Sequence, residues 1–171
     1  MLHILTIHEA YPGHYVQLEY GNRCPSTIRK VFNSGVFAEG WAVYTEQMML
    51  DQGYGDGDLS LRLHQLKFYL RAVINAILDY QMHCTNLSDE DAMKLLVGRA
   101  FQTEGEAAGK VQRAKQSSTQ LSTYFVGRTA FYRLRQQVQR ARGDAFDLGK
   151  YHEEVLSHGT LSVKYLPMLV K

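Results

Sequence analysis

The stretch HEAYPGH, residues 8–14, decides how the chain begins to fold, because it places Pro12 and Gly13 between two histidines. On an unbroken α-helix, positions 8 and 14 differ by about 600° of rotation and about 9 Å of rise, so their side chains point apart. Pro12 has no N–H, and its ring clashes with the carbonyl group of His8. Gly13 can adopt the backbone angles that a distortion requires. The stretch therefore predicts a helix deformed at Pro12, with His14 brought round towards His8.

Outside this stretch, the sequence predicts a single all-α domain. Only three prolines occur, and apolar residues recur mostly three and four positions apart. The expected helices cover residues 2–20 with a bend at Pro12, 26–52 with a break near Ser34, 59–83, 88–100, 104–115, 121–142 and 147–159. The segment DQGYGDGD, residues 51–58, is the clearest loop. Ser88 and Asp147 are expected to cap their helices, and Gly159 is expected to end the last one.

The composition limits the class of protein and its partners. The chain has 171 residues, 45% of them hydrophobic, which is enough for one domain with a core of its own. Its 19 Lys and Arg nearly balance its 17 Asp and Glu, so charge gives no case for nucleic-acid or membrane partners. No apolar stretch reaches the roughly 18 residues needed to span a bilayer, and the N-terminus lacks a signal-peptide pattern, which leaves the compartment undetermined. Cys24 and Cys84 could form one bridge, but both are expected as buried free side chains.

The two histidines and the glutamate between them point to a metal-dependent hydrolase. Imidazoles of His8 and His14 could bind zinc at about 2.0–2.1 Å, which would leave Glu9 placed to accept a proton from water. A catalytic zinc needs a third protein ligand, and Glu39 in FAEGWAVYTEQ is the expected donor. Glu46 lies some 10 Å further along the same helix face, so we expect it either to be solvated or to support a ligand. The alternative is that the proline simply ends a helix and the histidines are ordinary polar side chains.

These motifs resemble a bacterial family of zinc-peptidase-like proteins known as the domain of unknown function DUF885. That family is similar to the angiotensin-converting-enzyme and thermostable-carboxypeptidase group of gluzincins. The resemblance rests on HEAYPGH and EGWAVYTEQ, and extends through RAVINAILDYQMH, STQLSTYFVGR and FDLGKYHEEVLSHGTLSV. It implies His8, His14 and Glu39 as zinc ligands and Glu9 as the general base. It also implies the fold of the C-terminal catalytic half of such a peptidase, because family members are usually several times longer.

A first polar stripe consists of Arg71, Asn75, Asp79 and His83, which recur every four residues along one helix face. These residues form either a salt-bridge ladder between helices or a substrate-binding site. In the second case, Asp79 orients His83, which donates a hydrogen bond to the substrate carbonyl. The resemblance implies Asp79 and His83 as usual family residues, and an arginine where Asn75 stands.

A second stripe consists of Gln120, Tyr124, Arg128 and Tyr132. The stretch TYFV resembles the segment of converting-enzyme relatives whose tyrosine stabilises the tetrahedral oxyanion, which implies this role for Tyr124. A phenol suits the role because it is neutral at pH 7 and donates a strong hydrogen bond. Arg128, one turn further on, could grip a substrate carboxylate as a planar fork. The alternative is that the aromatic side chains belong to the core and Arg128 is solvated.

Together these residues predict a zinc metallopeptidase that acts on a peptide substrate. Two rivals stay open, a helical binding or structural module without metal, and a metal-dependent hydrolase of a non-peptide amide that uses the same residues. Because the resemblance implies that the half of the domain covering the zinc groove lies outside this chain, we expect weak peptidase activity. We also expect exposed apolar side chains among Val36, Phe37, Leu66 and Phe68, which would favour a homo-oligomer.

Overall fold

Helices form where the sequence places capping residues ahead of apolar residues at three- and four-residue spacing. The computed structural model describes residues 1–170, in which no β-strand occurs. The elements in order are α1 (Leu2–Glu9), α2 (His14–Arg23), α3 (Thr27–Val31), α4 (Gly35–Asp51), α5 (Leu59–Cys84), α6 (Asp89–Ala100), α7 (Glu104–Gln116), α8 (Thr123–Arg142), η1 (Gly143–Ala145), α9 (Leu148–Ser157) and η2 (Val163–Met168). Ser88 caps α6 and Asp147 caps α9 as expected, and Thr103 forms a capping box with Glu106 at the start of α7. The prediction of an all-α protein is confirmed.

The first expected helix, over residues 2–20, is in fact two helices. α1 ends at Glu9 and α2 begins at His14, and the Tyr11–Pro12 peptide bond between them is cis. Only glycine fits at position 13, because a Cβ on Gly13 would lie 1.8 Å from the carbonyl oxygen of His8. A non-helical turn over residues 10–13 therefore separates the two helices, where the sequence predicts only a bend within one helix.

The remaining boundaries follow the local sequence signals. The break expected near Ser34 separates α3 from α4, and the Ser34 hydroxyl accepts a hydrogen bond from the Phe37 backbone N–H. The loop expected after α4 occupies residues 52–58. Gly159 follows α9 with a φ of +74°, a conformation that suits glycine at the end of a helix.

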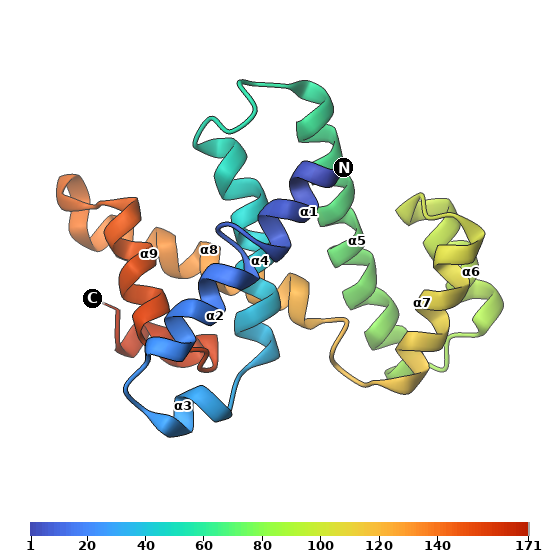
Figure 1. Cartoon of the computed structure of the whole chain (residues 1–171). Coiled ribbons are helices and arrows are strands. Elements are labelled where there is room, and N and C mark those ends of the chain that lie inside the picture. The colour runs from blue at the N-terminus through green and yellow to red at the C-terminus, as the bar shows by residue number, and fades with distance from the viewer. Residues whose placement is uncertain (171) are drawn as a thin grey trace.

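Three clusters of buried side chains form the core. One joins α4, α8, α9 and η2 around Trp41 and Phe131. Another joins α5, α6 and α7 around Leu78 and Leu96, and a smaller one holds α1 against the start of α5 around Ile7. Figure 1 shows the resulting arrangement, in which α6 and α7 pair beside the far end of the long helix α5, while α2 and α9 lie on the other side of the molecule.

Helices α4 and α8 cross at two facing glycines. A Cβ on Gly40 would lie 2.4 Å from the Cα of Gly127, and a Cβ on Gly127 would lie 2.0 Å from the carbonyl oxygen of Val36. Glycine at both positions therefore allows the close approach of the two helices. Glu39 and Tyr124 stand within one turn of this crossing, so it fixes two of the expected site residues relative to each other.

The two cysteines lie in different environments. Cys24 is buried and Cys84 is exposed, and both are free thiols. The expectation that both are buried is therefore wrong for Cys84, because it is the last residue of α5 and its side chain faces solvent rather than the core.

The apolar surface differs in part from the expected one. Phe37, expected to be exposed, is only 1% exposed because it packs edge-on against Phe131 in the core. Leu66 is 51% exposed, as expected, while Val36 and Phe68 are partly buried. Within residues 1–170, no helix is both long and apolar enough to span a lipid bilayer.

Candidate metal centre

Three side chains from three helices converge beside the turn that follows α1. His8 is near the end of α1, His14 is the first residue of α2, and Glu39 lies in the first half of α4. The Glu39 Oε2 atom lies 3.4 Å from His14 Nε2 and 3.7 Å from His8 Nε2. One potential ligand atom of each residue lies within 4.8 Å of the other two. The turn thus brings together the three residues that the sequence singles out as ligands.

Trp41 holds this turn in place. Its indole N–H donates a hydrogen bond of 2.9 Å to the carbonyl oxygen of Pro12, and its ring is 1% exposed. Because Trp41 follows Glu39 by only two residues, α4 supplies both a member of the cluster and the anchor for the turn that carries the two histidines.

Glu46 fixes the orientation of the His8 ring. The Nδ1–H of His8 donates a hydrogen bond of 2.7 Å to Glu46 Oε1, so Nε2 is the atom that faces Glu39. Glu46 is 1% exposed, and burial raises the pKa of its carboxyl group. Of the two roles that the sequence leaves open for Glu46, the structure gives it the one of supporting His8.

The electrostatics of the cluster are those of a tight ion pair. Burial by itself lowers the pKa of His8, but the hydrogen bonds with Glu39 and Glu46 outweigh it and raise that pKa to about 9. Burial likewise acts to raise the pKa of Glu39, yet the hydrogen bonds from His14 and His8 lower it to about 2. A cation that binds here would therefore displace the proton of His8 and take over its pairing with Glu39.

The donor set and spacing suit a divalent metal ion. Two imidazole nitrogens and a carboxylate oxygen are common zinc ligands, and such ligands around a tetrahedral ion lie roughly 3.3 Å from one another. The distances from Glu39 Oε2 to the two imidazole nitrogens, 3.4 and 3.7 Å, are close to this value. The side chains of His8, His14 and Glu39 are 12%, 21% and 22% exposed, so one side of the cluster remains accessible.

Two further expected residues border the cluster. Glu9 is exposed and directly follows His8. The Tyr124 hydroxyl, at the start of α8, interacts with the Glu39 carboxylate and accepts a hydrogen bond of 3.2 Å from Arg113. Burial and the negative charge of Glu39 raise the pKa of Tyr124, which keeps the phenol neutral. No signal in the sequence pointed to Arg113, because it lies on α7, outside the recognised motifs.

His83 and Asp79 make contacts at the far end of α5. The Nε2 atom of His83 lies 3.1 Å from the carbonyl oxygen of Ala114, and the Asp79 carboxylate accepts hydrogen bonds from the backbone N–H groups of Thr119 and Ser122. These contacts tie α5 to the connection between α7 and α8. Among residues 1–170, neither side chain has a contact with the three-residue cluster.

Arg128 is held between aromatic rings. Its guanidinium lies 3.9 Å from the ring centroid of Tyr69 and 4.5 Å from that of Tyr132, and it donates a hydrogen bond to Gln47. The stacking and the hydrogen bond give Arg128 a place in the contact between α4, α5 and α8.

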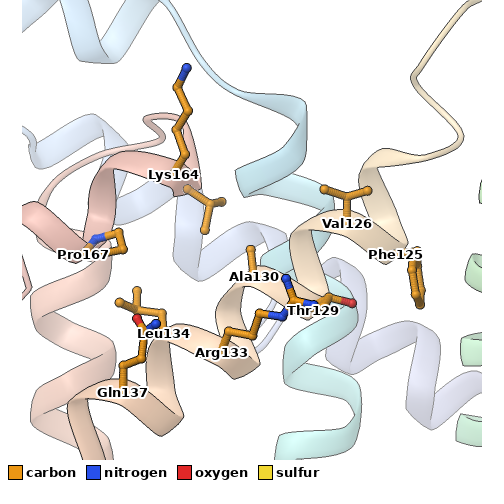
Figure 2. Close-up of a pocket in the computed structure, with 10 residues that line it drawn as sticks. Phe125, Val126, Thr129, Ala130, Arg133, Leu134, Gln137, Lys164 and Pro167 are labelled. Atoms are coloured by element: carbon orange, nitrogen blue, oxygen red, sulfur yellow. The ribbon is translucent and has the colours of Figure 1, made fainter. Parts of the chain in front are cut away.

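A separate cavity lies between α8 and η2. It has a volume of about 390 Å³ and a mostly apolar lining that includes Phe125, Val126 and Leu134, with Arg133 and Lys164 among the polar residues (Figure 2). None of its lining residues belongs to the cluster of His8, His14 and Glu39. The candidate metal centre is therefore defined by the convergence of these three side chains and not by this cavity.

The fold and the site describe an all-helical protein with two histidines and a glutamate arranged as potential metal ligands. The sequence matches the family described as bacterial protein of unknown function, DUF885, over residues 1–170, and the chain belongs to this family.

Two solved structures share the fold. A candidate lipoprotein of unknown function from Shewanella oneidensis has 45% sequence identity and a TM-score of 0.94, over 98% of this chain and 31% of that one. A candidate lipoprotein from Colwellia psychrerythraea has 27% identity and a TM-score of 0.92, over 98% of this chain and 29% of that one. The chain therefore spans about a third of the length of the solved structures that it matches. A comparison with curated proteins found no significant match.

Proposed function

We propose that the chain carries the catalytic centre of a zinc-dependent peptidase. The observation that supports this most is the convergence of His8, His14 and Glu39 from three helices, with both imidazoles presenting Nε2 to the same carboxylate oxygen. The support that Glu46 gives to His8 is typical of a metal ligand, whose second ring nitrogen usually donates to a carboxylate or a carbonyl group. An ordinary buried histidine needs no second carboxylate opposite the first.

Glu9 and Tyr124 would move and stabilise charge during the reaction. A zinc ion held by the three ligands supplies Lewis-acid polarisation of the scissile carbonyl and makes a water molecule easier to deprotonate. Glu9 accepts the proton from the attacking water and delivers it to the nitrogen of the leaving amine. Its exposed position next to His8 leaves its carboxylate free to do so.

Tyr124 donates a hydrogen bond to the oxyanion that develops on the substrate carbonyl. Because Arg113 already donates to the phenol oxygen, the single O–H proton of Tyr124 is left for an acceptor on the side of Glu39. The positive charge of Arg113 also makes that proton a stronger donor. The two residues therefore act together at the edge of the metal centre.

Metal content tests the first half of this proposal. After purification and dialysis, we expect about one zinc ion per chain in the parent protein and far less in the variant His14→Ala, because a catalytic site has only three protein ligands to lose. His64→Ala is the matched control, since His64 lies on α5 and bonds to the backbone oxygen of Ser60. Equal trace amounts of zinc in the parent and in His14→Ala would rule out the site and favour a metal-free helical module.

Peptide hydrolysis tests the second half. A set of internally quenched peptides is incubated with the zinc-loaded parent protein and with Glu9→Gln. We expect cleavage by the parent, and loss of cleavage with retention of zinc in Glu9→Gln, because the amide cannot accept the proton. A zinc-loaded parent that cleaves none of the peptides would contradict the peptidase assignment and favour the hydrolysis of a non-peptide amide.

A further inference from the structure

A cationic cavity lies between α5 and α7, on the Tyr124 side of the metal centre. Its volume is about 280 Å³, and its lining residues are Arg71, Gln102, Glu106, Gly109, Lys110 and Arg113. Three of these six residues are cations and one is an anion. The cavity combines residues from two helices and from the connection between α6 and α7, so the fold assembles it.

The single carboxylate of the cavity is already used. Glu106 pairs with Arg71 at 2.8 Å and also accepts hydrogen bonds from the backbone N–H and the hydroxyl of Thr103. Within residues 1–170, neither Lys110 nor Arg113 lies within ion-pair distance of a carboxylate. Burial, followed by the charges of Arg113 and Arg71, lowers the pKa of Lys110. The cavity therefore holds an excess of positive charge that the described part of the chain does not neutralise.

Two buried donors in the cavity also have no acceptor. Gln102 is 5% exposed, and its Nε2 atom has no hydrogen-bond partner in the described structure. The same is true of the Nε atom of Arg71. Leaving a buried donor unsatisfied costs about 1–3 kcal/mol, so native proteins seldom do so without a ligand or water to complete the bonds. Both donors and the excess charge call for the same kind of partner, an anion with several acceptor oxygens.

One side chain connects this cavity to the metal centre. Arg113 lines the cavity and donates a hydrogen bond of 3.2 Å to the Tyr124 hydroxyl, which in turn interacts with the Glu39 carboxylate. Tyr124 therefore interacts both with Arg113 of the cavity and with Glu39 of the ligand cluster. A peptide that lies across Tyr124 would therefore meet both the ligand cluster and the cavity.

We infer that Lys110, Arg113, Gln102 and Arg71 form the subsite for the terminal carboxylate of the peptide substrate. The inference rests on the proposed function and narrows it to peptides that are cleaved close to a free C-terminus. An arginine fork and a lysine charge are well suited to a carboxylate, and charge-assisted hydrogen bonds are the strong ones. A desolvated lysine without an ion-pair partner lowers stability, so its presence here is explained by a role in binding. Lys110→Met should therefore raise the melting temperature of the protein.

Matched peptides test this subsite in the zinc-loaded protein. The kcat/KM is measured for one short peptide as the free acid, as the C-terminal amide, and as an amide with glutamate in the last position. We expect the free acid to exceed the plain amide by roughly tenfold or more, the size of one charge-assisted hydrogen bond. The third peptide separates a terminal carboxylate from a side-chain carboxylate. If the amide with glutamate is cleaved as fast as the free acid, the assignment to the terminal group is wrong.

Variants show whether the preference comes from this cavity. Lys110→Met and Arg113→Gln should reduce the preference for the free acid to about threefold or less, since each removes one charged contact. Lys150→Met is the matched control, because Lys150 is exposed on α9 and its loss changes the net charge equally. If both cavity variants keep the full preference of the parent, the subsite lies elsewhere.

A binding experiment separates this inference from the proposed function. Calorimetric titration of His14→Ala with the acetylated dipeptide acetyl-Ala-Ala, as free acid and as amide, needs no metal and no turnover. We expect heat of binding for the free acid alone, and its loss when Lys110→Met is added. Selective binding without hydrolysis by the parent would support the carboxylate subsite and contradict the peptidase. Hydrolysis by the parent at equal rates for the free acid and the amide, without selective binding, would support the peptidase and contradict the carboxylate subsite.

Discussion

The Nδ1 atom of His8 lies 2.7 Å from the Oε1 atom of Glu46, so a buried carboxylate holds the imidazole from behind while its Nε2 atom faces Glu39. Glu39 and Glu46 stand seven residues apart on α4, close to two helical turns, which places both on one face of the helix. One helix thus supplies the carboxylate in front of the His8 ring and the carboxylate behind it.

Replacing Glu46 should weaken zinc binding without removing any of the three expected ligands. We expect Glu46→Ala to lower zinc affinity by roughly 10- to 100-fold, because the His8 ring loses its orientation and basicity. Glu46→Gln should lose less, since its amide oxygen can still accept the Nδ1–H bond. The measurement is competition for zinc with a chelating dye.

The control for this prediction is Gln52→Ala, at the exposed end of the same helix. It should bind zinc as the parent does. If Glu46→Ala also binds zinc as tightly as the parent, the contact between His8 and Glu46 stabilises the fold but has no influence on the metal.

The sequence predicts the helices well because their signals are local. Pro12 and Gly13 indicate the break in the helix. Ser88 and Asp147 indicate helix starts, because their side chains accept hydrogen bonds from backbone N–H groups of the first turn. The HEAYPGH stretch also predicts that His14 approaches His8. Pro12 and Gly13 break the helix between them, and on an unbroken helix the two side chains would point apart. The hydrogen bond from the Trp41 indole to the Pro12 carbonyl oxygen joins residues far apart in the chain, so it cannot be derived from this stretch alone.

Contacts between distant helices carry the part of the site that the sequence does not predict. Whether Glu46 is solvated or supports His8 depends on how α1 lies against α4, and periodicity within one helix contains no such information. The sequence does not predict the cationic cavity for the same reason, because Arg71 and Arg113 come together only when α5 packs beside α7. The burial of Phe37 likewise depends on its contact with Phe131, which forms only when α4 packs against α8.

The Tyr124 hydroxyl should contribute to turnover but not to metal binding. We expect Tyr124→Phe to retain zinc and to lower kcat by roughly 100-fold or more, the usual effect of losing one oxyanion donor. Tyr80→Phe is the matched control, because Tyr80 is 62% exposed on α5. Steady-state hydrolysis of a fluorogenic peptide is the measurement. Full turnover in Tyr124→Phe would make this tyrosine a packing residue of the contact between α4 and α8.

The crossing of α4 and α8 should not tolerate a methyl group. In Gly127→Ala, the new Cβ would lie 2.0 Å from the carbonyl oxygen of Val36, so the helices must move apart. We expect a loss of about 1–3 kcal/mol or more in the free energy of unfolding, measured with urea. Gly98→Ala on α6 has open space around its Cβ and should instead gain about 0.5–1 kcal/mol from helix propensity. Equal stability of the two variants would contradict the close crossing.

His152 should make the fold sensitive to mild acid. The Tyr44 hydroxyl lies 2.7 Å from its Nε2 atom, and burial, assisted by the charge of Arg135, lowers the pKa of His152 to about 4. Because an unfolded histidine has a pKa of about 6.5, the unfolded chain binds a proton between pH 6.5 and 4 that the folded protein does not. The contribution of neutral His152 is therefore complete above pH 6.5 and is lost as the pH falls towards 4.

The variant His152→Gln removes this titration and keeps an acceptor for Tyr44. We expect the parent to lose about 1–2 kcal/mol more than His152→Gln in the free energy of unfolding between pH 7 and 4.5, allowing for the partial exposure of the ring. Urea unfolding at four pH values across this range measures the difference in the free energy of unfolding between the two proteins. The contributions of all other titrating groups are common to both and cancel. His64→Gln is the control for the substitution itself, because the His64 Nδ1 atom lies 2.8 Å from the backbone oxygen of Ser60 on its own helix. A constant gap between parent and His152→Gln would show that His152 titrates alike in the folded and unfolded chains.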